Sequence, residues 1–293
     1  MADNRKKEAV QAAPNFWKES LERFLHNPVA VISCVVLIII IIACVSAPLL
    51  TPYTYSEMNI DERYAPFSKE HIFGTDGLGR DLFARVLYGG QVTLNITFTA
   101  LLTAAAAGTV LGIATGVFGG TFDNIVLRIM DGLSAIPTLF LAVMVESALG
   151  FGVGNYKYAI ALSLIPPFVR LLRPMVISIL SSEYVEAARA LGVGKIEIIA
   201  RHVIPNITAP VLIHFSNTAA EALLTCTILS YVGIGVNPPM PEWGELVAYG
   251  YNYIRSQSNV SLIPCFVVAI TALAMNLLGN GLRDALDPDA GDR

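Results

Sequence analysis

The sequence predicts an all-α integral membrane protein with six transmembrane helices, and two observations lead to that prediction. Of the 293 residues, 54% are hydrophobic and only 14% are charged, and the mean hydropathy is +0.60. A soluble domain has about one quarter charged residues. The apolar residues also come in long uncharged blocks, which are typical of membrane spans of about 20 residues. The net charge of −4 argues against a partner nucleic acid, which would need a basic surface.

The first span is expected over Val29–Leu50, which is longer than the apolar part of a cleavable signal peptide. Pro137 lies inside the third span, and Pro166-Pro167 removes two backbone donors within the fourth, so we expect a break or kink there. The other five spans are expected over Val92–Phe118, Arg128–Gly150, Tyr158–Leu172, Ile207–Val236 and Val260–Leu282.

These spans divide the chain into five parts. They are an N-terminal tail (1–27), a first helix (28–50), an outer segment (51–90), a core of five helices (91–284) and a C-terminal tail (285–293). Thirteen Lys and Arg residues fall on the side of both tails and six on the other side. Cytoplasmic segments carry the excess of positive charge, so both termini are expected in the cytoplasm.

The outer segment contains Asp76, Arg80 and Asp81. They lack the ligand count of a calcium site, so we expect a loop ordered by internal ion pairs and no metal. A second outer stretch, Asn237–Pro241, has too many prolines for a regular helix and is expected outside the hydrocarbon or in a protein cavity.

Four glycines recur at every fourth position of the second span and form one smooth stripe on a helix, which lets another helix approach closely. The stripe predicts close packing against another helix of this chain; the alternative is contact with a partner permease. Its members are Gly108, Gly112, Gly116 and Gly120.

The stretch 181–206 lies between the fourth and fifth spans, on the side that the charges place in the cytoplasm. Glu183–Leu191 is composed mostly of strong helix formers, and Gly192 permits a tight turn. A second short helix is expected over Lys195–Val203 and is expected to end at Pro205. The pattern therefore predicts a stiff helix–glycine–helix hairpin outside the bilayer.

Within this hairpin, Glu186-Ala187-Ala188, Gly192 and Ile204-Pro205 resemble the EAA loop of binding-protein-dependent ABC importers. His202 replaces the isoleucine of the general pattern, as is typical of the dipeptide and oligopeptide branch. In that family the loop docks into a groove of a cytoplasmic ATPase. The resemblance implies a coupling role for Glu183, Glu186, Ala187, Ala188, Gly192, Ile196, Ile199, His202 and Pro205.

Three more segments are similar to the C-type permease of that branch: Phe73–Asp81, Leu229–Gly244 and Asn276–Pro288. The resemblance implies the type I ABC importer permease fold in a bacterial or archaeal cytoplasmic membrane. It implies a second permease, two ATPases, a solute-binding protein and surrounding lipid as partners. ATP and Mg would be bound by the ATPases, because Gly192–Ile196 lacks the spacing of a phosphate-binding loop.

Ionisable groups inside spans are candidates for lining a translocation path. His214 and Glu221 are such candidates, whereas Glu146 is expected near an interface. Cys226 stands where relatives often have an acid, and it is also interpreted, like Cys34, Cys44 and Cys265, as a small buried hydrophobe. Trp243 is expected at the outer interface or near the exit of the path. The path set is therefore His214, Glu221, Cys226 and Trp243.

Several functions stay open. The leading one is import of dipeptides or oligopeptides, and the alternative within the family is a nickel-chelate or other small-solute importer. An ion-coupled secondary transporter would usually show internal repeats, which we do not find. A membrane enzyme is disfavoured because no nucleophile–base set is visible. The sequence does not identify the solute or the second permease.

Overall fold

The computed structural model describes residues 16–150 and 155–286. Most of the two predicted tails, including residues 1–15 and 287–293, lies outside this part, as does the side chain of Glu146. The helices are α2 (Phe16–His26), α3 (Pro28–Val45), α4 (Ala47–Leu50), the 3₁₀ turn η1 (Ile60–Glu62), α5 (Leu82–Phe118), α6 (Gly120–Ala135), α7 (Thr138–Leu149), α8 (Tyr156–Leu180), α9 (Glu183–Ala190), α10 (Lys195–Ile198), the π-helical turn η2 (Ile199–Val203), α11 (Ile204–Tyr231), α12 (Trp243–Tyr251) and α13 (Ser258–Leu286).

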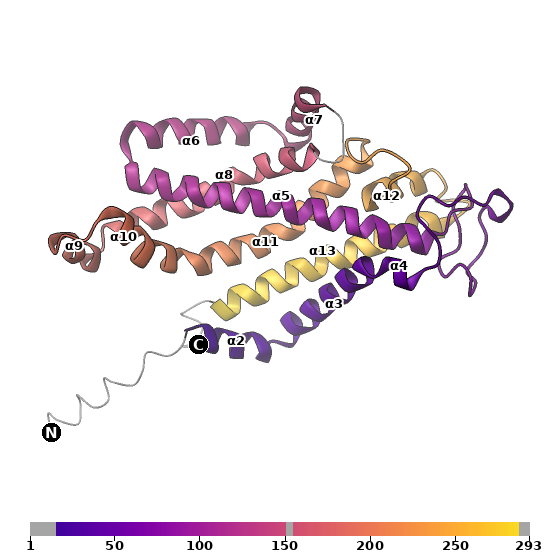
Figure 1. Cartoon of the computed structure of the whole chain (residues 1–293), viewed down its shortest axis with the longest axis horizontal. Helices are drawn as coiled ribbons and strands as arrows, with labels where there is room; N and C mark the ends of the chain where they lie inside the picture. The colour runs from indigo at the N-terminus through magenta and orange to yellow at the C-terminus, as the bar shows by residue number, and fades with distance from the viewer. Residues whose placement is uncertain (1–15, 151–154, 287–293) are drawn as a thin grey trace, which may run out of the picture.

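The long helices α3, α5, α8, α11 and α13 run side by side as an elongated bundle (Figure 1). Helices α9 and α10 project from one end, which we name the hairpin end, and residues 51–81 cover the opposite end, which we name the loop end. Within the described residues, five helices are long and apolar enough to cross a membrane, and α6 with α7 makes up to a sixth. The all-α membrane fold is therefore confirmed.

The third span is not the single helix that the hydropathy predicts. Helices α6 and α7 meet at an angle of 102°. Ile136, which ends α6, has extended backbone angles of φ −92° and ψ 121°. The ring of Pro137 disfavours the helical conformation of the residue before it, and the helix stops there.

No break occurs at Pro166-Pro167, because both prolines lie inside the continuous helix α8. Helix α8 packs along α5, where Phe168 and Leu172 are fully buried. Such packing, rather than local propensity, supplies most of the stability of a helix in a protein. It offsets the two missing backbone hydrogen bonds.

The glycine stripe of α5 lies against α8. A Cβ atom on Gly112 would lie 2.9 Å from Cβ of Leu172, and one on Gly116 would lie 2.7 Å from Cβ of Val176. Gly108 likewise faces Phe168. The contact of these three glycines is thus within the chain. Gly120 is different, because it is the first residue of α6 and not part of α5. It has φ +58°, and a Cβ atom added to it would have no atom within 4 Å.

The outer segment predicted over 51–90 ends at Asp81, and α5 begins well before Val92. The carboxylate of Asp81 accepts a 2.6 Å hydrogen bond from the backbone N–H three residues later and so caps the helix. Arg85, a charge that the pattern placed outside, lies within α5 and donates to Glu245 at 3.0 Å. Pairing with a carboxylate lets the helix include a residue that hydropathy alone excludes.

Candidate functional site

The first arm of the hairpin is helix α9, close to the prediction. Val185 is fully buried and anchors α9 to the bundle. Gly192 has φ +85°, a left-handed conformation that favours glycine, and its N–H donates to the carbonyl of Arg189 at 3.0 Å. The turn that separates the two arms therefore depends on Gly192.

The second arm is not a separate short helix, and the prediction that it ends at Pro205 is wrong. Residues Lys195–Tyr231 form one uninterrupted helix of 37 residues, made of α10, η2 and α11. The π-helical turn η2 precedes Pro205, and the N–H of Ile204 bonds to the carbonyl of Ile199. Pro205 directly follows η2 inside this continuous helix, where its missing N–H leaves one helical hydrogen bond unmade.

The tip of the hairpin exposes large apolar side chains. Leu191 is 85% exposed and Ile196 is 84% exposed. Ile198, in contrast, is 2% exposed and Val203 is fully buried. Ile196 therefore points away from the bundle, whereas Ile198 and Val203 pack into it. Exposed apolar groups at a protruding tip are typical of a surface for a partner.

Polar and small side chains surround this tip. Glu183, Glu186 and Ala187 are exposed, Ala188 is half-buried, and all four lie within α9. His202 is half-buried, with its ring centroid 5.7 Å from that of Tyr184 on the other arm. The predicted coupling residues thus lie on one protrusion, with Ile199 and Pro205 at its base.

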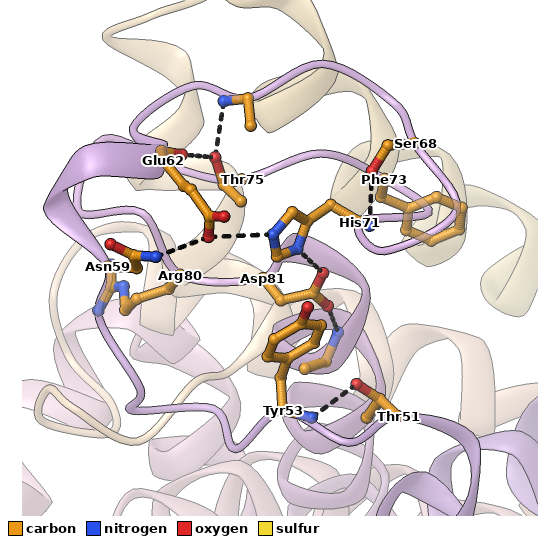
Figure 2. Close-up of polar contacts among 12 residues, drawn as sticks. Thr51, Tyr53, Asn59, Glu62, Ser68, His71, Phe73, Thr75, Arg80 and Asp81 are labelled. Atoms are coloured by element: carbon orange, nitrogen blue, oxygen red, sulfur yellow. Dashed lines mark hydrogen bonds and ion pairs between the residues drawn. The ribbon is translucent and has the colours of Figure 1, made fainter.

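At the loop end, the predicted ion-paired loop is confirmed. Asp76 accepts from Arg80 Nε at 2.7 Å, and both are buried. His71 lies between two carboxylates: its Nδ1 is 2.8 Å from Asp81 Oδ2 and its Nε2 is 3.4 Å from Glu62 Oε2 (Figure 2). We name His71, Asp81 and Glu62 the histidine clasp. In the part of the chain that the structure describes, no group of three or more His, Cys, Asp or Glu residues could hold a metal ion.

Electrostatics decide the charge of the clasp. Burial opposes a charge on His71, but the hydrogen bonds to Asp81 and Glu62 outweigh it and raise the pKa of His71 above its ordinary value. Because Asp81 also caps α5, the ring of His71 ties the outer segment to the start of that helix.

The side chain of Trp243 is covered by the chain itself and is not presented to lipid head groups. Its side chain is fully buried, its Nε1 donates to the carbonyl of Val86 at 2.8 Å, and its backbone N–H donates to Thr93 Oγ1 at 3.0 Å. Gly90 opens the space for it, since a Cβ there would lie 2.7 Å from the indole ring. Trp243 therefore fixes α12 to α5 and does not face a path.

Cys226 is also buried inside the chain. Its Sγ lies 3.3 Å from Glu242 Oε1, and Tyr156 donates to Glu242 Oε2 at 3.0 Å. Cys226 and Glu242 have no exposed surface. The sequence analysis missed Glu242 and Tyr156, and the signal that could have found Glu242 is its place directly before the Trp243-Gly244 pair.

The two remaining path candidates lie on α11. Glu221 is exposed. His214 is half-buried, with its ring edge against Phe168 at a centroid distance of 4.4 Å, and its Nε2 has no hydrogen-bond partner among the described residues. Of the predicted path set, only Glu221 presents its side chain fully to the surroundings of the chain.

Comparisons with known proteins agree with this architecture. Residues 108–291 match the model of the binding-protein-dependent transport system inner membrane component, and residues 15–66 match the N-terminal TM domain of oligopeptide transport permease C. The chain is similar to the dipeptide transport system permease protein DppC of Alkalihalophilus pseudofirmus, with 36% identity over 93% of this chain and 90% of that protein.

Two further matches extend the comparison. The glutathione transport system permease protein GsiD of Pectobacterium atrosepticum is 35% identical over 93% of this chain and 91% of its own length. A solved structure of the MetNI methionine ABC transporter in an inward facing conformation matches with a TM-score of 0.57 and 19% identity, over 69% of this chain and 96% of that one. At that identity the structural match shows the fold alone.

Proposed function

Since the chain belongs to the family of binding-protein-dependent transport system inner membrane components and is the permease subunit of an ABC importer, we propose that it carries peptides. It has no ATP site of its own. It forms the translocation path with a second, different permease, and a solute-binding protein delivers dipeptides or oligopeptides to them. The names of the dipeptide, D,D-dipeptide and glutathione relatives support this solute class.

One observation carries the coupling proposal: the hairpin tip exposes Leu191 and Ile196 almost completely. A soluble or membrane-embedded monomer gains nothing from holding two large apolar groups in water at the end of a protrusion. Docking of an ATPase subunit over the tip would bury them. ATP and Mg then belong to two ATPase subunits, and their movement is passed to the permease through α9 and α10.

The orientation follows from the same proposal. The hairpin end and both termini lie in the cytoplasm, and the loop end faces the binding protein outside the cytoplasmic membrane. The charge count of 13 against six supports this orientation. So does the position of α2 and of the end of α13 toward the hairpin end (Figure 1).

The test is uptake by the complete complex in proteoliposomes, with the second permease, both ATPases and the binding protein. We expect ATP-dependent uptake of labelled dipeptides, and loss of uptake without loss of membrane insertion when Glu186–Gly192 is deleted. A matched control is Gly132→Ala, where a Cβ has nothing within 4 Å. Uptake that survives the deletion would contradict the coupling proposal, and uptake of nickel chelates in place of peptides would contradict the solute class.

A further inference from the structure

Helix α11 carries a line of polar side chains along one face. His214, Asn217, Glu221 and Thr225 follow one another at spacings of three or four residues, which places them on one side of a helix. Glu221 is exposed and the other three are half-buried. We name these four residues the polar stripe. A polar stripe on a long membrane helix needs a polar surrounding, because lipid offers no hydrogen bonds.

Around Glu221 the rest of the chain leaves this face open, whereas His214 packs against Phe168 of α8 and Oδ1 of Asn217 lies against Gly279 of α13. Leu224 and Ile228, which flank Glu221 on the same side, are 44% and 57% exposed. Within residues 16–150 and 155–286, Glu221 has no hydrogen bond and no ion pair. The carboxylate is therefore free to meet a group that is not part of this chain.

The depth of Glu221 makes a lipid-facing position costly. At 1.5 Å per residue it lies about 25 Å from the start of α11 at Ile204 and about 15 Å from its end at Tyr231. The hydrocarbon of a bilayer is about 30 Å thick. Intramembrane carboxylates almost always face a water-filled cavity or a protein partner, so the stripe lies along the translocation path.

We propose that Glu221 binds the protonated amino terminus of the peptide as it passes along α11, an inference that rests on the proposed function. An ammonium group has three N–H donors. One charge-assisted hydrogen bond goes to the carboxylate of Glu221, and the hydroxyl oxygen of Thr225, one turn further along α11, accepts another.

This assignment fits a transporter that takes peptides of different sequence. The amino terminus is common to linear peptides whatever their side chains, so a site for it selects the class and not the individual solute. Because neutral Asn217 and Thr225 flank a single carboxylate, the site favours a single positive charge. The stripe offers no cationic group besides His214, two turns away, to bind the carboxyl terminus.

The experiment uses the complete complex in proteoliposomes and compares Glu221→Gln with the wild type. The probes are one labelled dipeptide with a free amino terminus and its N-acetylated form, each supplied at equal occupancy of the binding protein. For Glu221→Gln we expect uptake of the free dipeptide to fall about tenfold, the loss of one charge-assisted hydrogen bond. Uptake of the acetylated form and ATP hydrolysis stimulated by the binding protein should stay unchanged, and Glu221→Asp should restore part of the uptake.

Controls separate this inference from its premise. Glu70→Gln makes the same chemical change at an exposed position of the outer segment and should leave both rates unchanged. In Glu221→Cys, a water-soluble thiol reagent should react above the background of the wild-type chain, and the free dipeptide should slow that reaction.

The outcomes are distinct. If the wild-type complex with ATP takes up no peptide, the proposed function fails. If it does, and Glu221→Gln keeps the wild-type ratio of the two probes, only the amine-binding role fails. An unreactive Glu221→Cys, or loss of the second permease from purified Glu221→Gln complexes, would show that the carboxylate meets a protein partner and would likewise overturn the inference.

Discussion

Truncation of the two apolar side chains at the hairpin tip, Leu191→Ala with Ile196→Ala, should weaken ATPase binding without unfolding the permease. Each change removes three carbon atoms from side chains that are 85% and 84% exposed. At about 0.8 kcal/mol per buried CH₂, full burial in the complex is worth about 2.4 kcal/mol for each residue. If the complex buries only half of each side chain, the two truncations together still weaken ATPase binding about 50-fold.

The matched control is Ile198→Ala, two residues from Ile196 but only 2% exposed. A buried Ile→Ala change costs about 2–5 kcal/mol of folding stability, whereas changes at exposed positions stay within about 0.5 kcal/mol. The assay is the affinity of purified ATPase for the permease in nanodiscs, together with the unfolding temperature. Binding of the double variant within twofold of wild type would refute the reasoning, and so would a loss of unfolding temperature as large as that of Ile198→Ala.

Three further predictions concern the fold. Gly112→Ala should lower the unfolding temperature by an amount equivalent to about 1–3 kcal/mol, because the new Cβ crowds α8, whereas Gly132→Ala should not; equal effects would contradict the close approach. Trp243→Phe leaves the carbonyl of Val86 without its donor and should cost about 1–3 kcal/mol in the same assay, and an unchanged midpoint would count against the burial of the indole. The raised pKa of His71 means that its contribution is complete below about pH 6.5 and is lost as pH rises through the folded-state value. Protection of the amides of residues 51–81, which is the exchange rate relative to the intrinsic base-catalysed rate, should therefore fall on alkalinisation in the wild type and not in His71→Gln; the same pH dependence of protection in both would exclude the clasp.

Hydropathy and glycine spacing were enough to predict most of the fold, because both report local chemistry. The apolar blocks predicted the long helices correctly. The left-handed turn at Gly192 was predicted because glycine adopts that conformation readily. Proline shows where this reasoning stops. Pro137 precedes a right-angled break, but Pro166 and Pro167 lie in an unbroken helix. The difference is the surface of α5 against which α8 packs, and no pattern local to the prolines contains it.

In the candidate site, too, residues of a local motif were predicted and residues with distant neighbours were not. The coupling residues are contiguous in sequence, so a motif could find them. Cys226 is buried, as its residue type predicts. The burial of Trp243 was missed because its surroundings come from distant segments: its backbone N–H bonds to Thr93, 150 residues earlier. A tryptophan in an outer segment usually marks an interface. Here the space opened by Gly90 admits it to the interior instead.

The uninterrupted helix from Lys195 to Tyr231 makes Ile196 of the tip and the polar stripe parts of a single helix about 55 Å long. A tilt of about 10° around its middle would displace each end by about 5 Å in opposite directions. In the coupling proposed above, movement of Ile196 would reach the polar stripe through the helix itself, without a relay of side chains. A change in the helical winding of η2 would absorb part of that movement. The stiffness of this turn therefore determines how much of the movement reaches the polar stripe.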